Sequence, residues 1–255
     1  MFFPQNIYIG IDPTAGNKPI IYAAVDQELQ MVALGGGDMD EVLAFVGGQR
    51  QAVVSICAPQ GPNLGLMADE SFRQTLSPPP KPGRWKNYRV AEYYLRKHNI
   101  HITPTPSLVN ACPGWIKTGF AIIRRITSLA YQPFSQSDSS LQYLEVYPQA
   151  SYAMLLGHNP FLKHSLEGRL QRQLVLYERN INLPDPMNFF EEITRHRILN
   201  GVLPSGILHQ PAELDALVGA YCAWLVKNRP DQVAWVGDPQ EGQIMLPGVE
   251  LKNRY

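Results

Sequence analysis

Three short apolar segments joined by tight links open the chain, at residues 7–12, 20–26 and 30–34. The first reads Ile-Tyr-Ile-Gly-Ile-Asp and is bounded by turn residues, which is typical of a buried strand. Because so few residues separate the segments, successive strands are expected to run in opposite directions. The sequence therefore predicts an antiparallel three-stranded meander, and we interpret the glycine triplet at 35–37 as the turn that ends it.

Asp12 closes the first of these segments, and Pro13 and Gly16 interrupt the strand directly after it. In α/β proteins, groups that bind ligands commonly collect at the carboxyl ends of strands. Asp also starts many turns, because its side chain accepts hydrogen bonds from nearby backbone amides. The segment alone favours the turn, so Asp12 becomes a candidate ligand only if other carboxylates join it.

Two later segments carry the same strand signal. Residues 51–57 form an unbroken apolar run, as expected for a parallel strand buried on both faces. Residues 141–147 form a fifth strand, which Glu145 interrupts. A carboxylate in a buried strand is costly unless it is paired with a cation or bound to a metal. Alternatively, Glu145 lies on the exposed face of a half-buried strand, and its apolar neighbours do not decide between the two.

The clearest helix spans residues 211–227, where Pro211 and an acidic first turn are start signals. It is apolar almost all round, so we expect it to be buried. Gly219 would let it approach the sheet closely, and Asp215 on the same stripe should point inward. The other predicted elements are helices over 38–46 (capped by Asp38 and Glu41), 84–97 and 115–131, a helical insertion at about 152–205, and a C-terminal hairpin at about 233–247.

Composition restricts the classes of function. Lys and Arg together number 22, and Asp and Glu together also number 22. This balance argues against a tight, non-specific nucleic-acid binder. Three cysteines without a CxxC pair argue against a disulfide framework and a structural zinc site, and they fit a reducing cytoplasm. Residues 1–4 lack the features of a signal peptide, and no stretch approaches the roughly 20 apolar residues of a membrane-spanning helix. We expect a single cytoplasmic domain, and the sequence leaves the oligomeric state open.

Asp12, Glu145 and Asp215 emerge as three candidate carboxylates. The order of elements matches the ribonuclease H-like fold, an α/β fold with a mixed five-stranded sheet and helices on both faces. In that fold, strands one and four end side by side, and the last helix brings an acid over them. Clustered carboxylates stay ionised beside cations, and Mg²⁺ or Mn²⁺ suits oxygen ligands. Two such ions about 3.5–4 Å apart support phosphodiester hydrolysis.

The sequence also resembles the domain-of-unknown-function family 429, whose members are described as predicted ribonuclease H-like nucleases. The resemblance implies this fold over most of the chain, and it implies metal-dependent nuclease activity as an expectation. It rests on Gly10-Ile11-Asp12, Ser55-Ile56-Cys57-Ala58-Pro59, Arg89 with Glu92, Glu145-Val146-Tyr147-Pro148, Glu167-Gly168-Arg169 with Arg172, Leu214-Asp215-Ala216 with Ala220, and Gly237-Asp238-Pro239 with Glu241-Gly242 and Ile244.

The chain departs from the family pattern at Cys57, where the family usually has Asp. A thiol is a poor ligand for Mg²⁺. One hypothesis is a divalent-metal-dependent nuclease in which Asp12, Glu145 and Asp215 bind Mg²⁺ or Mn²⁺ and act in catalysis. The alternative is a catalytically silent binding or scaffold protein on the same fold. An actin-like or sugar-kinase-like ATPase ranks last, because it would need glycine-rich phosphate loops on both halves and a second copy of the core.

Three arginines are candidates for holding the phosphates of a nucleic-acid substrate: Arg89, Arg169 and Arg172. A simpler explanation is that these residues lie on helix faces exposed to solvent. Lys163 and Glu167, for example, stand four residues apart, as an ordinary helical ion pair would.

Overall fold

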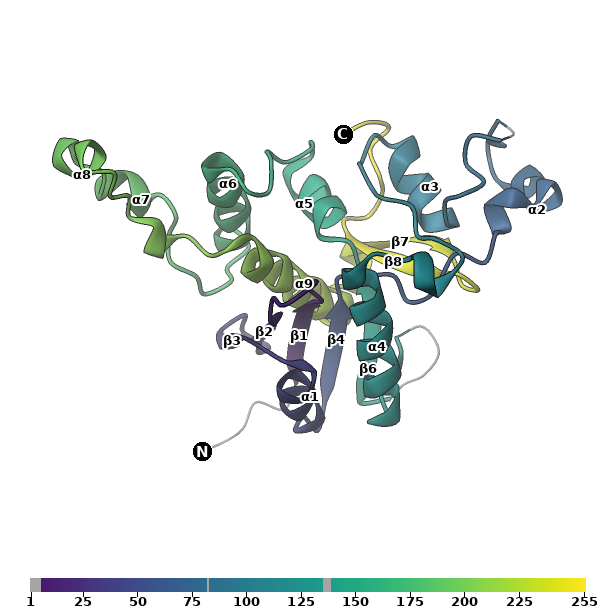
Figure 1. Ribbon diagram of the computed structural model, residues 1–255, viewed down its shortest axis with the longest axis horizontal. Helices are drawn as coiled ribbons and strands as arrows, with labels where there is room; N and C mark the ends of the chain where they lie inside the picture. Colours follow the sequence, from purple (N-terminus) through teal and green to yellow (C-terminus); the bar gives the residue numbers. More distant parts are fainter. Residues whose placement is uncertain (1–5, 82, 135–138) are drawn as a thin grey trace.

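The computed structural model describes residues 6–81, 83–134 and 139–255 (Figure 1). The first four residues, considered above for a signal peptide, lie outside the described residues. The described strands are β1 (Ile7–Asp12), β2 (Ile20–Val25), β3 (Met31–Gly37), β4 (Ala52–Ile56), β5 (Gln132–Pro133), β6 (Leu141–Val146), β7 (Val233–Asp238) and β8 (Gly242–Pro247).

These strands form one mixed sheet with the order β3-β2-β1-β4-β6-β8-β7, and β5 pairs with β6 beside this path. The predicted meander is confirmed, since β1 pairs antiparallel with β2 and β2 with β3. β4 runs parallel to both β1 and β6, as the unbroken apolar run at 51–57 predicted. The order β3-β2-β1-β4 is typical of ribonuclease H-like folds.

Within the described residues the sheet has eight strands rather than the five predicted. The C-terminal hairpin was predicted, but its place in the sheet was not. β8 pairs parallel with β6, with Glu145 opposite Ile244, and β7 then pairs antiparallel with β8. The pairing joins residues about 100 positions apart in the sequence, and local turn signals carry no information about such a partner.

The glycine triplet at 35–37 lies inside β3, where we had predicted a turn. A Cβ on Gly37 would lie only 2.4 Å from Oε2 of Glu41. The absent side chain leaves room for Glu41 to accept from the backbone N–H of Asp38, so the predicted capping box of helix α1 (Met39–Gly47) forms. The strand therefore continues up to the helix without an intervening loop.

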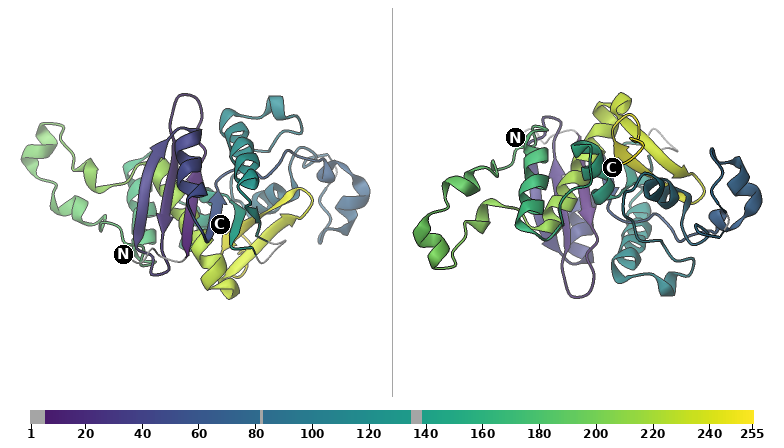
Figure 2. Two further views of the ribbon diagram at one scale, coloured as in Figure 1. Left: turned by 90° about the horizontal axis from the view of Figure 1, so that it is seen from below. Right: turned by 90° about the horizontal axis from the view of Figure 1, so that it is seen from above.

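Helices cover both faces of the sheet. The remaining ones are α2 (Glu70–Thr75), α3 (Val90–Lys97), α4 (Gly114–Ser128), α5 (Pro148–Leu156), α6 (Leu166–Tyr177), α7 (Asn188–Glu191), α8 (Arg195–Leu199) and α9 (Pro211–Asn228). α3 begins six residues later than the predicted helix over 84–97. α6, α7 and α8 occupy the predicted insertion, and α7 and α8 extend away from the sheet (Figure 2).

The two faces of the sheet are built by alternate residues of the strands. Tyr8 of β1 packs in a core with α9, whereas Ile9 and Ile11 pack in a second core with α1 and α4. By the same alternation, Asp12 falls on the α9 side. This face assignment decides which of the predicted carboxylates can meet.

Gly219 lets α9 pack directly on β1, as predicted. A Cβ on Gly219 would lie 3.2 Å from the Cα of Gly10, and a Cβ on Gly10 would lie 1.9 Å from the carbonyl oxygen of Ala216. Neither position can accept a side chain without moving the helix. The backbone of α9 is thereby held against the strand that ends in Asp12. None of the helices that the structure describes is long and apolar enough to cross a membrane.

Candidate functional site

Asp12 and Asp215 line one cleft of about 1090 Å³. We call it the acidic cleft, and its floor is formed by Asp12 at the end of β1, Asp215 in the second turn of α9, and Cys57 just after β4. The loop after α5, including Lys163, forms one wall, and the first turn of α4, including Trp115, also contributes. The structure thus brings together two of the three carboxylates predicted from the sequence.

Lys163 supplies the cation of this site, and the sequence did not reveal it. Its ammonium donates to Oδ2 of Asp215, which is 52 residues away. Lys163 lies in the loop that precedes α6, so the helical pair with Glu167 suggested by their spacing is not its role. The Asp215 side chain is only 9% exposed and that of Lys163 is 37% exposed, so water screens this pair incompletely.

The pKa of Asp12 is raised to about 7, first because burial disfavours its charged form and then because Asp215 repels it. Lys163 opposes the shift without cancelling it. The pKa of Asp215 is also raised, again first by burial, and Lys163 lowers it in part. The two carboxyls and one ammonium therefore form a coupled group, in which one negative charge is poorly compensated near neutral pH.

Cys57 occupies the position where a third carboxylate would complete the floor. Its backbone N–H donates to the carbonyl of Ile11 at 2.9 Å, which places it beside Asp12. Its thiol contacts the carbonyl oxygen of Asp215 at 3.5 Å. Burial and then the negative charge of Asp12 and Asp215 raise the pKa of this thiol well above its ordinary value. The thiol is therefore neutral and is no ligand for a hard cation.

Glu145 does not join Asp12 and Asp215. Its neighbours Leu144 and Val146 pack in the core with α9, so Glu145 faces the other side of the sheet. There Nη1 of Arg89 donates to its Oε2 at 3.0 Å, and Nη2 donates to its Oε1. The expectation that Glu145 completes a three-carboxylate site is thus not supported by its placement, because an arginine already compensates its charge.

Arg89 is fully buried at the centre of an ionic network, so it is not placed to hold a substrate phosphate. Besides Glu145, it binds Glu92 through Nε at 3.0 Å and the carbonyl of Glu241 at 3.1 Å. Glu241 in turn accepts backbone N–H groups, including that of Leu64 at 3.0 Å. The network joins α3, β6 and the β7–β8 turn to the loop after β4.

Arg169 and Arg172 brace the backbone around the acidic cleft and do not line it. Arg169 donates from Nε to the carbonyl of His209 at 2.9 Å, directly before α9. Arg172 is buried and donates from Nη1 to the carbonyl of Phe161 at 2.8 Å, in the loop that carries Lys163. Both side chains are engaged by the protein, which does not support the predicted phosphate-binding role.

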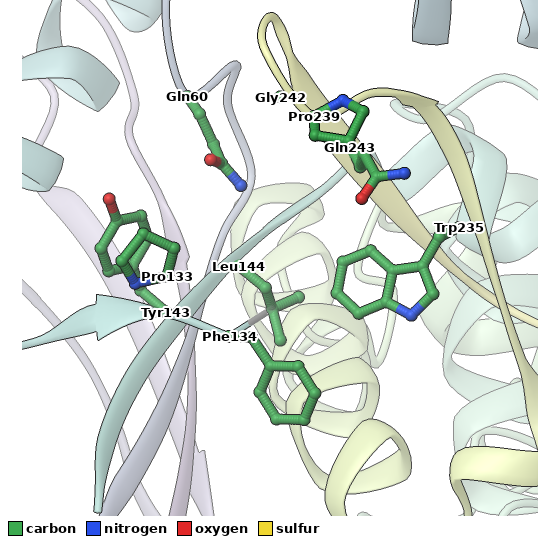
Figure 3. A pocket seen from close by; sticks show the side chains of 9 residues that line it. All are labelled: Gln60, Pro133, Phe134, Tyr143, Leu144, Trp235, Pro239, Gly242 and Gln243. Carbon is green, nitrogen blue, oxygen red and sulfur yellow. The ribbon is translucent and has the colours of Figure 1, made fainter. Parts of the chain in front are cut away.

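A second cavity, far smaller, lies beside β6 and β7 (Figure 3). Phe134 and Trp235 line it, and their rings stack with centroids 6.0 Å apart. Its volume of about 30 Å³ is close to that of a single water molecule. The acidic cleft is therefore the better candidate for a ligand site.

The chemistry of the donors can be tested against the implied metal. Within residues 6–81, 83–134 and 139–255, no group of three or more His, Cys, Asp or Glu side chains could hold a metal ion. Asp12 and Asp215 nevertheless offer oxygen ligands, and Mg²⁺ is commonly held by one or two carboxylates plus waters and substrate phosphates. Asp12 and Asp215 could hold one hard divalent cation, and with Cys57 beside them the described residues offer no third carboxylate here for a second ion.

The fold and the cleft define an α/β protein with the strand order of ribonuclease H-like folds and two carboxylates at the meeting point of β1 and α9. A family model described as "Protein of unknown function (DUF429)" matches residues 10–241, and the chain belongs to this family. The resemblance inferred from the motifs is thus confirmed. No curated protein and no solved structure matches the chain.

Proposed function

We propose that this protein hydrolyses phosphodiesters of DNA or RNA with one divalent cation, Mg²⁺ or Mn²⁺, held by Asp12 and Asp215. The single observation that carries the proposal is the meeting of these two carboxylates in the acidic cleft. Burial, and then repulsion by Asp215, raises the pKa of Asp12, and a bound cation would relieve the repulsion. When bound, such a cation lowers the pKa of a coordinated water and stabilises charge on a phosphoryl oxygen.

The chain's own groups have distinct tasks in this proposal. Asp215, held on α9 by the close Gly10–Gly219 packing, fixes the position of one oxygen ligand. Lys163 can donate up to three hydrogen bonds, so its ammonium can hold a phosphate oxygen once a cation takes its place on Asp215. Arg172 and Arg169 keep the Lys163 loop and the start of α9 in place.

A second function is favoured by a specific observation, the ion pair between Lys163 and Asp215. An ammonium in this place already compensates one carboxylate, as a metal would. Together with the neutral Cys57 thiol, it suits a protein that keeps the fold and the cleft as a binding module and does no chemistry. This is the catalytically silent alternative drawn from the sequence.

One experiment separates the two functions. Mn²⁺ binding is measured by calorimetry, and hydrolysis of bis(p-nitrophenyl) phosphate is measured with Mn²⁺ present. The hydrolase binds one Mn²⁺ and turns the substrate over, and Asp12→Asn or Asp215→Asn abolishes both. The matched control is Asp40→Asn, at an exposed carboxylate on α1. Folded wild-type protein that neither binds Mn²⁺ nor hydrolyses the diester would rule out the hydrolase.

A further inference from the structure

The acidic cleft has aromatic walls beside its carboxylates. Trp115 from α4 and Phe161 from the loop after α5 both line it. Phe161 is 59% exposed and the adjacent Leu162 is 81% exposed. Large apolar side chains beside a pair of carboxylates are not required for cation binding. They indicate a ligand that has a flat apolar part as well as a charged part.

The wall that carries Phe161 is anchored through its backbone. The N–H of Phe161 donates to Oε1 of Gln171 at 2.8 Å, and its carbonyl accepts from Arg172 at 2.8 Å. A Cβ on Gly168 would lie 1.9 Å from the carbonyl oxygen of Leu162, so α6 packs against this backbone. The side chains of Phe161 and Leu162 are therefore presented from a fixed main chain, which lowers the entropy lost when they bind a ligand.

The wall that carries Trp115 packs closely against the turn that follows Asp12. A Cβ on Gly114 would lie 3.3 Å from Cβ of Ala15, which follows Asp12 by three residues. The indole of Trp115 packs partly against the core with α1 and α4 and is half-buried. One aromatic ring thus rests beside the turn after Asp12, while Phe161 stands on the Lys163 loop.

Cationic and imidazole groups complete the cleft. Lys18 in the β1–β2 link, His101 and His164 all line it, and all three residues are exposed. Resting on the proposed hydrolase function, we propose that the substrate is single-stranded nucleic acid, with an unpaired base against Trp115 and Phe161 and its phosphate at Asp12, Asp215 and Lys163. Lys18 and the two imidazoles would then contact flanking phosphates.

The substrate must be unpaired because of where the aromatic groups lie. In a duplex, each base face is covered by the neighbouring base, and only base edges are accessible in the grooves. An aromatic ring can stack on an internal base only when that base has left the helical stack, and a base that leaves the stack also loses its pairing partner. The net charge of zero also provides no broad basic surface for a duplex backbone.

Fluorescence anisotropy with labelled oligonucleotides tests this assignment. A ten-nucleotide single strand and the matching blunt duplex are titrated with the full chain in Ca²⁺, chosen to limit turnover. We expect the single strand to bind at least about tenfold more tightly than the duplex. Phe161→Ala and Trp115→Ala should each weaken single-strand binding by about tenfold, within the range measured for base–aromatic stacking. Trp115→Phe, which keeps a stacking ring, should restore most of the loss.

The matched control is Phe190→Ala on α7, which removes a phenylalanine of similar exposure (53%) outside the cleft and should leave binding unchanged. Equal or tighter binding of the duplex, or full affinity in folded Phe161→Ala and Trp115→Ala, would overturn the assignment. Hydrolysis of bis(p-nitrophenyl) phosphate without oligonucleotide binding would refute the substrate class alone. Aromatic-dependent oligonucleotide binding without any hydrolysis would refute the hydrolase function alone.

Discussion

The ammonium of Lys163 rests on the carboxylate of Asp215, and through it the loop before α6 is joined to the helix that covers the sheet. Burial is the main cause of the raised pKa of Asp12, and Asp215 and Lys163 also act on it, so Asp12 lies within the same group of charges. A divalent cation bound by the two carboxylates must therefore compete with an internal one. This competition makes Lys163 the most informative side chain to replace.

Lys163→Met should increase the affinity for Mn²⁺ by about tenfold, or about 1.4 kcal/mol, because no ammonium then needs to leave Asp215. Affinity is measured by calorimetry at pH 8, where protons compete least with the metal. Lys18→Met is the control, since it removes the same charge from the same cleft without touching the Asp215 ion pair. Unchanged or weaker Mn²⁺ binding in Lys163→Met would show that Lys163 does not occupy the cation position.

Asp12 should make the metal-free protein less stable as pH rises. Its pKa is about 7 in the folded protein against an ordinary value of 3.8, so the folded state holds a proton that the unfolded state has lost between these values. The stabilisation is complete below about pH 4 and disappears as pH rises through about 7.

Asp12→Asn should remove this slope and be more stable than wild type at pH 8 by about 1–3 kcal/mol, since Asp12 is partly buried. Urea unfolding in EDTA at pH 5, 6, 7 and 8 measures it, with Asp40→Asn as the control. A wild-type protein whose unfolding free energy rises from pH 5 to pH 8 relative to Asp12→Asn would contradict the raised pKa. Under the proposed function the same variant should also lose hydrolysis, so stability and function would change in opposite directions.

Glu145→Gln should cost about 3 kcal/mol of unfolding free energy, because it breaks a buried ion pair and leaves Arg89 undercompensated. Mn²⁺ affinity of the folded variant should stay at the wild-type value, since Glu145 faces away from the cleft. Urea unfolding and calorimetry give the two readouts, and Glu250→Gln, at an exposed residue, is the control. Loss of Mn²⁺ binding at full stability would restore Glu145 as a metal ligand.

Cys57→Asp should rebuild the carboxylate that the family usually carries. In EDTA, a third buried negative charge should lower the unfolding free energy by about 2–4 kcal/mol. Mn²⁺ should recover this loss and bind with a stoichiometry of two rather than one. Cys57→Ser, which is neutral and similar in size, should show neither effect. A Cys57→Asp protein that still binds one Mn²⁺ would mean that the cleft cannot hold a second ion.

Local signals in the sequence were sufficient to predict most elements of the fold. β1, β2 and β4 are apolar runs with turn residues at their ends, and α9 has a proline start and a continuous apolar surface. What escaped prediction depends on distant contacts. β3 continues through its glycines because they pair with Ile20, Ile21 and Tyr22 of β2, and β8 joins β6 from about 100 residues away.

The residues of the candidate site also separate into those that local sequence predicts and those that depend on distant contacts. Asp12 and Asp215 were predictable, because a strand end and the first turns of a buried helix restrict where their carboxylates can point. The role of Glu145 could not be predicted, because it depends on the cation that faces it. That cation is Arg89, which lies 56 residues earlier in the sequence. No pattern in the sequence distinguished Lys163, which belongs to a loop without periodicity.

The direct contact between Gly10 and Gly219 has a consequence for how such a protein can acquire new chemistry. Because the main chain of β1 packs directly on that of α9, the backbone positions of residues 12, 57 and 215 form a rigid frame. Movement of a loop cannot change their relative positions. Activity on this frame can change by exchange of a single side chain, as a cysteine for an aspartate at 57. The chemistry of the site can therefore change through one side chain while the backbone geometry stays the same.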